Sequence, residues 1–93
     1  MKSYRNSTQI VGTILETTGA SDRAGVQITT LMTKANLPYP RLSKFLENLI
    51  GSGLVNKIEQ DGKNTFIITE RGRMYLQEYK KFNDLAESFG LEL

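Results

Sequence analysis

Residues 27–52 of this sequence read QITTLMTKANLPYPRLSKFLENLIGS. The pattern predicts a short helix over residues 28–35, a tight turn over residues 36–40 and a longer helix that Gly51 and Gly53 stop. Each proline biases the residue before it toward extended backbone, so one helix cannot run through both Leu37 and Tyr39. Pro40 suits the first turn of a new helix, because no intrahelical N–H is needed there.

The second helix of this stretch is amphipathic. Its apolar residues recur at i, i+3, i+4, i+7 and i+8, as expected for one face of a helix: Leu42, Phe45, Leu46, Leu49 and Ile50. The opposite face carries Pro40, Arg41, Lys44, Glu47 and Asn48. Two short helices joined by a tight turn, with Arg, Lys and Asn displayed on the second, are typical of a helix-turn-helix.

Further elements are expected on both sides of this motif. Asn6 or Ser7 can cap an earlier helix that ends near residues 17–19, with Gln9 as a capping-box partner. Residues 19–25 form a loop by composition, and Val26 begins a very short strand. After the motif, residues 54–60 and 65–69 have strand composition, and Asp61-Gly62-Lys63-Asn64 lies between them. Asp-Gly in this context predicts a β-hairpin, although the pattern does not fix which face of each strand is buried.

The last helix is expected from about Glu70 to Phe89, with Thr69 as its cap and Gly90 at its end. Such a helix is about 30 Å long, which is more than a small core can cover. Its apolar residues follow the 4-3-4-3-4 spacing of a coiled-coil seam: Tyr75, Tyr79, Phe82, Ala86, Phe89 and Leu93. From about Phe82 onward the seam requires a second chain, so the sequence predicts a homodimer.

These elements together predict an α+β, mainly helical fold: a winged helix-turn-helix with a long C-terminal dimerisation helix. Residues 1–69 would form the winged helix-turn-helix part and residues 70–93 the dimerisation helix, within one compact domain. A chain of 93 residues has a modest core, which a dimer would help to stabilise.

Composition excludes several classes of function. The chain has no cysteine and no histidine, which excludes a thiolate or imidazole zinc site, a cysteine nucleophile and a Ser-His triad. No phosphate-loop motif occurs, and the acidic residues are scattered rather than paired. We therefore expect no enzyme, no metal and no cofactor. The sequence shows no membrane-spanning run and no signal peptide, so we expect a cytoplasmic, nucleoid-associated protein with no membrane partner.

The net charge is only +2, but its distribution is uneven. Residues 1–44 hold six basic residues against two acidic ones, the basic ones being Lys2, Arg5, Arg23, Lys34, Arg41 and Lys44. Residues 84–93 hold three acids and no base. This polarity suits docking of one face on a polyanion.

The chain resembles the archaeal winged helix-turn-helix DNA-binding proteins of the 10a type and related predicted archaeal transcriptional regulators. The matching pieces are IVGTILE at residues 10–16, KANLPY at 34–39, GLV at 53–55 and ITERG at 68–72. The resemblance implies a DNA-binding homodimer, joined through antiparallel C-terminal helices, in an archaeal cytoplasm. The chain departs from the family at Ile28 and Thr30, where basic residues are common, and at Pro38, where serine is common.

Candidate site residues follow from this reading. For base contacts we predict Arg41, Lys44, Asn48 and Tyr39, because Arg and Lys can bind guanine and Asn can bind adenine. For phosphate contacts we predict Lys34, Lys63, Asn64, Arg71 and Arg73. For the dimer interface we predict Tyr75, Tyr79, Phe82, Ala86 and Phe89.

The predicted function is a DNA-binding homodimer, either a transcriptional regulator or a chromatin-associated protein, with double-stranded DNA as its partner. The alternative is a winged-helix module that binds another protein and no DNA. Glu47 on the recognition helix favours that alternative, because a carboxylate repels phosphate. The same residues can also have no role in binding. In that alternative the polar face of the helix is simply solvated, and Tyr75 and Tyr79 belong to the core of the monomer.

Overall fold

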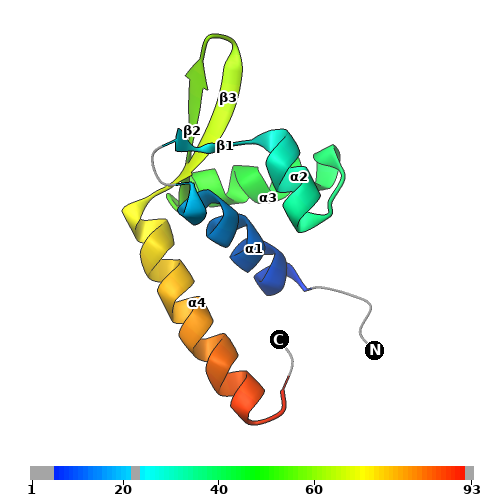
Figure 1. The fold of residues 1–93 in the computed structure, drawn as a ribbon, viewed down its shortest axis with the longest axis vertical. Helices are drawn as coiled ribbons and strands as arrows, with labels where there is room; N and C mark the ends of the chain where they lie inside the picture. The colour runs from blue at the N-terminus through cyan, green and yellow to red at the C-terminus, as the bar shows by residue number, and fades with distance from the viewer. Residues whose placement is uncertain (1–5, 22–23, 92–93) are drawn as a thin grey trace.

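The computed structural model describes residues 6–21 and 24–91, which form helices and strands in the predicted order (Figure 1). The helices are α1 (Ser7–Ala20), α2 (Ile28–Ala35), α3 (Tyr39–Gly51) and α4 (Glu70–Ser88). The strands are β1 (Val26–Gln27), β2 (Val55–Gln60) and β3 (Lys63–Ile68). The fold is the predicted mainly helical winged helix-turn-helix with a long last helix. The basic residues Lys2, Arg5 and Arg23 and the seam residue Leu93 lie outside the described residues.

Local sequence signals set the start of α1 and the turn between α2 and α3. The Asn6 side chain accepts a hydrogen bond from the Gln9 N–H at 2.8 Å, and Gln9 Oε1 accepts one from the Asn6 N–H at 3.1 Å, which confirms the capping box. Asn36 ends α2 in the left-handed conformation with φ 55°. Pro38 precedes α3 in extended conformation, and Pro40 lies in its first turn as predicted.

The sheet is antiparallel in the order β1-β3-β2, so the predicted short strand at Val26 pairs with the wing. The turn between β2 and β3 consists of Asp61 and Gly62, whose φ values of 54° and 76° are those of a type I′ turn. Cα pairing continues to Gln60 opposite Lys63. The sequence predicts Lys63 and Asn64 in the turn, but the structure places them in β3, because the two-residue turn closes directly onto the pair of Gln60 and Lys63.

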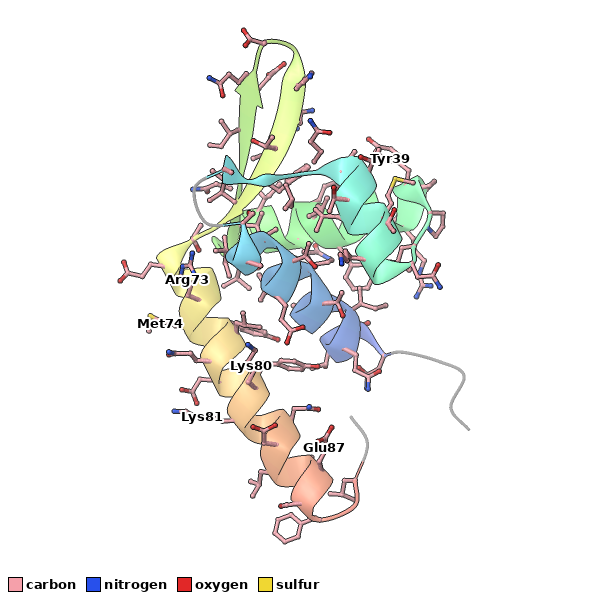
Figure 2. The ribbon with its side chains drawn as sticks, viewed as in Figure 1. Tyr39, Arg73, Met74, Lys80, Lys81 and Glu87 are labelled. Carbon is pink, nitrogen blue, oxygen red and sulfur yellow. The ribbon has the colours of Figure 1, made fainter. Side chains whose placement is uncertain are left out.

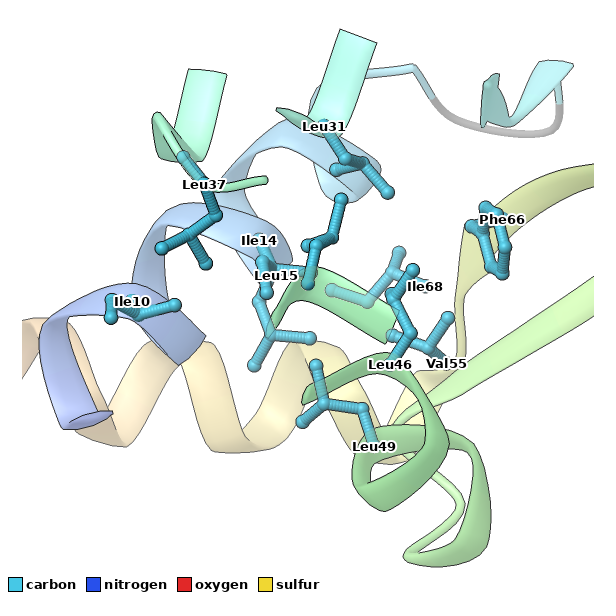
Figure 3. Close-up of a cluster of buried hydrophobic side chains, with 12 residues drawn as sticks. Ile10, Ile14, Leu15, Leu31, Leu37, Leu46, Leu49, Val55, Phe66 and Ile68 are labelled. Carbon is cyan, nitrogen blue, oxygen red and sulfur yellow. The ribbon is translucent and has the colours of Figure 1, made fainter. Parts of the chain in front are cut away.

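The core lies where α1, α2, α3 and the base of the hairpin meet (Figure 3). Its buried side chains are Ile10, Ile14, Leu15, Leu31, Ala35, Leu37, Leu42, Leu46, Leu49, Val55, Phe66 and Ile68. In β3 the buried residues alternate, and Phe66 and Ile68 face the core. The remainder of the wing extends into solvent (Figure 1).

Helix α4 is tied to the rest of the chain at its first turn and then runs along α1. Thr69 Oγ1 accepts a hydrogen bond from the Gly72 N–H at 2.9 Å, which confirms Thr69 as the cap, and donates one to the Gly53 carbonyl at 2.6 Å. Tyr79 lies over Gly12 of α1, where a Cβ would come within 2.5 Å of the ring. The last turns of α4 extend beyond α1 (Figure 1). No helix of the described part is long and apolar enough to span a membrane.

Candidate nucleic-acid interface

The outer face of α3 carries three polar side chains that point away from the core. Successive residues of an α-helix are rotated by about 100°, so the buried Leu42, Leu46 and Leu49 define an inward direction. Lys44 stands almost opposite that direction. Viewed down the helix axis, Glu47 and Asn48 lie about 50° to either side of the direction that points straight away from the core. All three are exposed and form the centre of the outward surface.

The other two predicted base-contacting residues flank this centre. Arg41 is exposed and leans to the same side as Asn48. Tyr39, the first residue of α3, leans the other way and is 54% exposed. Arg41 is therefore on the outer face of α3, whereas Tyr39 lies on the side of the helix that faces the wing, near Leu46 and Ile50. The structure thus places three of the predicted base-contacting residues, Arg41, Lys44 and Asn48, on the outer face of α3, and leaves Tyr39 exposed at the edge beside the wing.

A hollow of about 250 Å³ separates α3 from the wing. Its apolar part comes from Ile28, Leu46, Ile50 and Phe66, and its polar part from Tyr39, Ser43, Glu47, Lys57 and Asn64. Lys57 of β2 is a further basic residue in this hollow, and the sequence pattern does not indicate it. Lys57 is two residues after the buried Val55 and so lies on the same face of β2, but the strand pattern does not show that this face meets α3.

A second hollow lies beside the first turn of α2. Gln27, Ile28 and Thr29 line it together with Lys63 and Asn64 of the wing. The helix has no side-chain cap at Gln27. The partial positive charge of a helix N-terminus and the Lys63 ammonium group both favour an anion there. Two of the predicted phosphate-contacting residues are therefore close to the outer surface of the helix-turn-helix.

The other predicted phosphate-contacting residues lie elsewhere. Lys34 lines a third hollow, between α2 and α1, together with Thr13, Glu16, Thr17 and Ala20. Arg71 lies beside Gly53, and Arg73 lies beside Gly19 of α1. Figure 2 shows Arg73 near the start of α4, on a different part of the molecule from Tyr39. The structure does not bring Lys34, Arg71 or Arg73 into the hollows beside α3 and the wing.

Helix α4 divides the predicted dimer residues between two environments. Tyr79 is half-buried against α1 and Ala86 is buried, whereas Tyr75, Phe82 and Phe89 are exposed. Burial raises the pKa of the Tyr79 phenol above its usual value, and the carboxylates of Glu16 and Glu87 and the neighbouring Tyr75 raise it further.

The exposed apolar side chains of α4 form a stripe that the sequence pattern located only in part. Six of the eight large hydrophobic side chains that are exposed in the described residues lie on α4 or just after it: Met74, Tyr75, Phe82, Leu85, Phe89 and Leu91. Figure 2 shows Met74 pointing away from α1. The four on the helix and Phe89, the residue that directly follows it, fall within an arc of about 100°, centred about 50° from the predicted seam. We call Met74, Tyr75, Phe82, Leu85 and Phe89 the α4 stripe. Glu78 lies within this arc and pairs with Lys81 at 3.4 Å.

A model of the winged helix-turn-helix family matches residues 4–87. This chain belongs to that family. As a winged helix-turn-helix protein it has α3 as its second motif helix and the β2–β3 hairpin as its wing. No curated protein sequence matches the chain at a significant level.

Three solved structures are similar to this winged helix-turn-helix protein. One is Sso10a-2, a DNA-binding protein from Sulfolobus solfataricus, with TM-score 0.78, 22% identity, and coverage of 91% of this chain and 85% of that one. Another is F-93 of SSV1, with TM-score 0.65, 17% identity, and coverage of 95% and 97%. The third is the transcriptional regulator PA3341, with TM-score 0.64, 18% identity, and coverage of 87% and 62%. At these identities the likeness shows the shared fold, and it agrees with the resemblance to archaeal winged-helix proteins.

Proposed function

We propose that this protein binds double-stranded DNA as a homodimer and acts as a transcriptional regulator or a chromatin-associated protein of the archaeal cytoplasm and nucleoid. The observation that carries the proposal is the outward surface of α3, where Arg41, Lys44 and Asn48 are exposed together, with Tyr39 exposed at the edge beside the wing. The similar structures described as a DNA-binding protein and a transcriptional regulator support it.

In this proposal α3 enters the major groove. Arg41 and Lys44 can donate hydrogen bonds to the O6 and N7 atoms of guanine, and Asn48 can pair with the N6 and N7 atoms of adenine. Tyr39 can contact a thymine methyl group or a phosphate. Lys63 and Asn64 of the wing, next to the first turn of α2, would hold the DNA backbone and fix the register of α3 in the groove.

The other predicted phosphate contacts form a second group. Arg71 and Arg73 at the start of α4 and Lys34 at the end of α2 can reach DNA only where the duplex extends past the helix-turn-helix. We keep them as proposed phosphate contacts of longer duplexes. Binding to a short duplex should therefore depend on Lys63 more than on Lys34, Arg71 or Arg73.

We propose that the homodimer forms through α4. The support is the α4 stripe, which leaves side chains as large as Phe82, at 57% exposure, and Phe89, at 71%, in solvent in the single chain. Apolar surface concentrated on one face of a helix is typical of an interface. Tyr79 and Ala86 of the predicted seam lie on the side of this stripe nearer to α1. A two-fold dimer would place two copies of α3 about 34 Å apart, which suits a pseudo-palindromic or non-specific site.

The experiment is a salt series of binding to two duplexes, one of random sequence and one from the promoter region of the protein's own gene. With about four phosphate contacts per protomer, the log–log slope for a dimer should be about −7. Arg41→Ala and Lys44→Ala should each weaken binding. A promoter preference of about a thousandfold or more indicates a regulator, and equal affinity for both duplexes indicates a chromatin-type protein.

The competing function is a protein-binding module that uses the same helix surface. Glu47 favours it, because its carboxylate stands among the residues proposed to face DNA. A protein-binding module predicts no binding to either duplex at low salt, and no effect of Arg41→Ala or Lys44→Ala on DNA. That result would overturn the DNA proposal and leave the module as the better assignment.

A further inference from the structure

Glu47 is one of the three side chains at the centre of the outward surface of α3. It lies about one turn after Lys44. Viewed down the helix axis, it is about 50° from the direction that points straight away from the core, and Asn48 is about as far from that direction on the other side. It is exposed, and it lines the hollow between α3 and the wing together with Ser43 and Lys57. If α3 enters the major groove, Glu47 faces the bases as directly as Asn48 does.

No structural role accounts for the Glu47 carboxylate. Lys57 lines the same hollow, yet no ion pair within 4.0 Å joins these two described residues. Glu47 also does not cap a helix, since α3 begins after Pro38 without a side-chain cap. The carboxylate is therefore available to a ligand.

A carboxylate at this position has a definite effect on DNA recognition. Near phosphates it lowers affinity for every sequence. At the edges of the bases it can only accept hydrogen bonds, and in the major groove cytosine offers the N4 amino group as a donor. Guanine offers only the acceptors O6 and N7 there, which a carboxylate repels. A general loss of affinity is thus combined with a gain at one type of base pair.

We propose that Glu47 is a specificity-determining residue that accepts a hydrogen bond from the N4 amino group of a cytosine in each half-site. The inference rests on the proposed function, because it requires α3 to enter the major groove. It assigns to Glu47 the opposite role from the one that favours a protein-binding module: the same charge that weakens non-specific binding selects the sequence.

The test is a selection from a duplex library of random sequence, carried out with the wild-type protein, Glu47→Gln and Asp84→Asn. Asp84→Asn removes the same charge from an exposed position of α4 and serves as the matched control. The wild-type pool should be enriched in cytosine at one position of each half-site. The Glu47→Gln pool should lose that cytosine and favour adenine there, because glutamine pairs with the N6 and N7 atoms of adenine.

Direct binding then gives the size of the effect. For the wild-type protein, replacing that cytosine in one half-site should lower affinity by roughly 5- to 150-fold, the range for one good base contact. For Glu47→Gln the same replacement should have little effect, and affinity for a random duplex at low salt should rise. Asp84→Asn should select the same sequences as the wild type.

Two outcomes separate the inference from the function on which it rests. If the wild-type protein binds DNA but Glu47→Gln selects the same bases, or if the wild type shows no cytosine preference, Glu47 does not read sequence and the inference is overturned. If the wild-type protein binds no duplex at low salt, the proposed function itself fails, and the inference fails with it.

Discussion

Gly72 lies where the first turn of α4 meets the segment that follows α3. A Cβ at this position would clash with the Leu54 carbonyl oxygen and would come within 2.7 Å of Ile68 Cγ1. The Leu54 carbonyl also accepts the Thr69 N–H, so it cannot move away without loss of that hydrogen bond. Gly72→Ala should therefore lower the free energy of unfolding by about 2–3 kcal/mol, as overpacking in a tight site does. Urea denaturation followed by circular dichroism measures the change.

Gly51 provides the matched control for this prediction. It is the last residue of α3, and a Cβ there meets no atom within 4 Å. Gly51→Ala should leave stability unchanged or raise it by up to about 1 kcal/mol, because alanine reduces the entropy of the unfolded chain. An equal loss of stability in both variants would mean that close packing at Gly72 is not the cause.

Tyr79 gives a prediction about alkaline pH. Burial against α1, then the Glu16 carboxylate, raise its pKa in the folded chain above that of the unfolded chain. The unfolded state therefore releases the phenol proton first, so stability is full below about pH 10 and falls as the pH rises through the folded pKa. The wild type should lose stability more steeply than Tyr79→Phe above about pH 10, as measured by urea denaturation at each pH. Parallel pH profiles would contradict this assignment.

At the scale of elements, the wing is the part of the fold that we propose holds the DNA backbone. Lys63 is the first residue of β3 and lines the hollow beside the start of α2. Lys63→Ala should weaken binding to all sequences alike and reduce the magnitude of the salt slope by about 1 per protomer, because one phosphate contact is lost. Lys80→Ala removes an equal charge from α4 and should leave the slope nearly unchanged. The prediction fails if both variants have the same slope.

The elements themselves could be predicted because their signals are local. Asn6 with Gln9, Asp61 with Gly62, and Thr69 before α4 each act within a few residues, and the structure confirms all three. The position of Lys57 beside α3 could not be predicted in the same way, since it depends on how β2 packs on a helix in a different part of the chain. The two-residue period of a strand places Lys57 on the same face as Val55, but it does not show which helix lies beside that face.

The sequence pattern also could not predict which side of α4 faces α1. A broad apolar arc covers about half of the helix, and the seam spacing does not say which part of it meets α1. Gly12 settles this, because the missing side chain admits the Tyr79 ring. That contact joins residues far apart in sequence, and it turns the α4 stripe, with Met74 and Leu85, toward solvent.

At the scale of the whole molecule, the wing and the α4 stripe lie toward opposite ends of a structure that is 47 Å along its longest axis (Figure 1). The proposed dimer surface and the proposed DNA-binding surface are therefore separate on one protomer. A substitution on the stripe should change the oligomeric state without altering the residues that face DNA, and its effect on DNA affinity then reports the contribution of the second protomer.

Phe82→Glu tests this separation. Phe82 is 57% exposed on the stripe, and in a two-fold interface both copies are affected. Loss of two buried aromatic side chains, each contributing about 2 kcal/mol, should raise the dissociation constant of the dimer at least about 100-fold, and the new charge adds to that cost. Sedimentation equilibrium should show a monomer with an unchanged circular dichroism spectrum. Gln77→Glu introduces the same charge away from the stripe and should remain a dimer.

Loss of the dimer should also change how the protein binds DNA. A Phe82→Glu monomer retains one copy of α3 and one wing, so its salt slope should fall to about half that of the dimer, near −3.6 for four phosphate contacts. A folded Phe82→Glu monomer with the full slope would mean that one protomer makes all the phosphate contacts, and the two-fold arrangement on DNA would be wrong. A Phe82→Glu variant that stays dimeric would instead place the interface outside the α4 stripe and leave the DNA-binding surface of α3 unaffected.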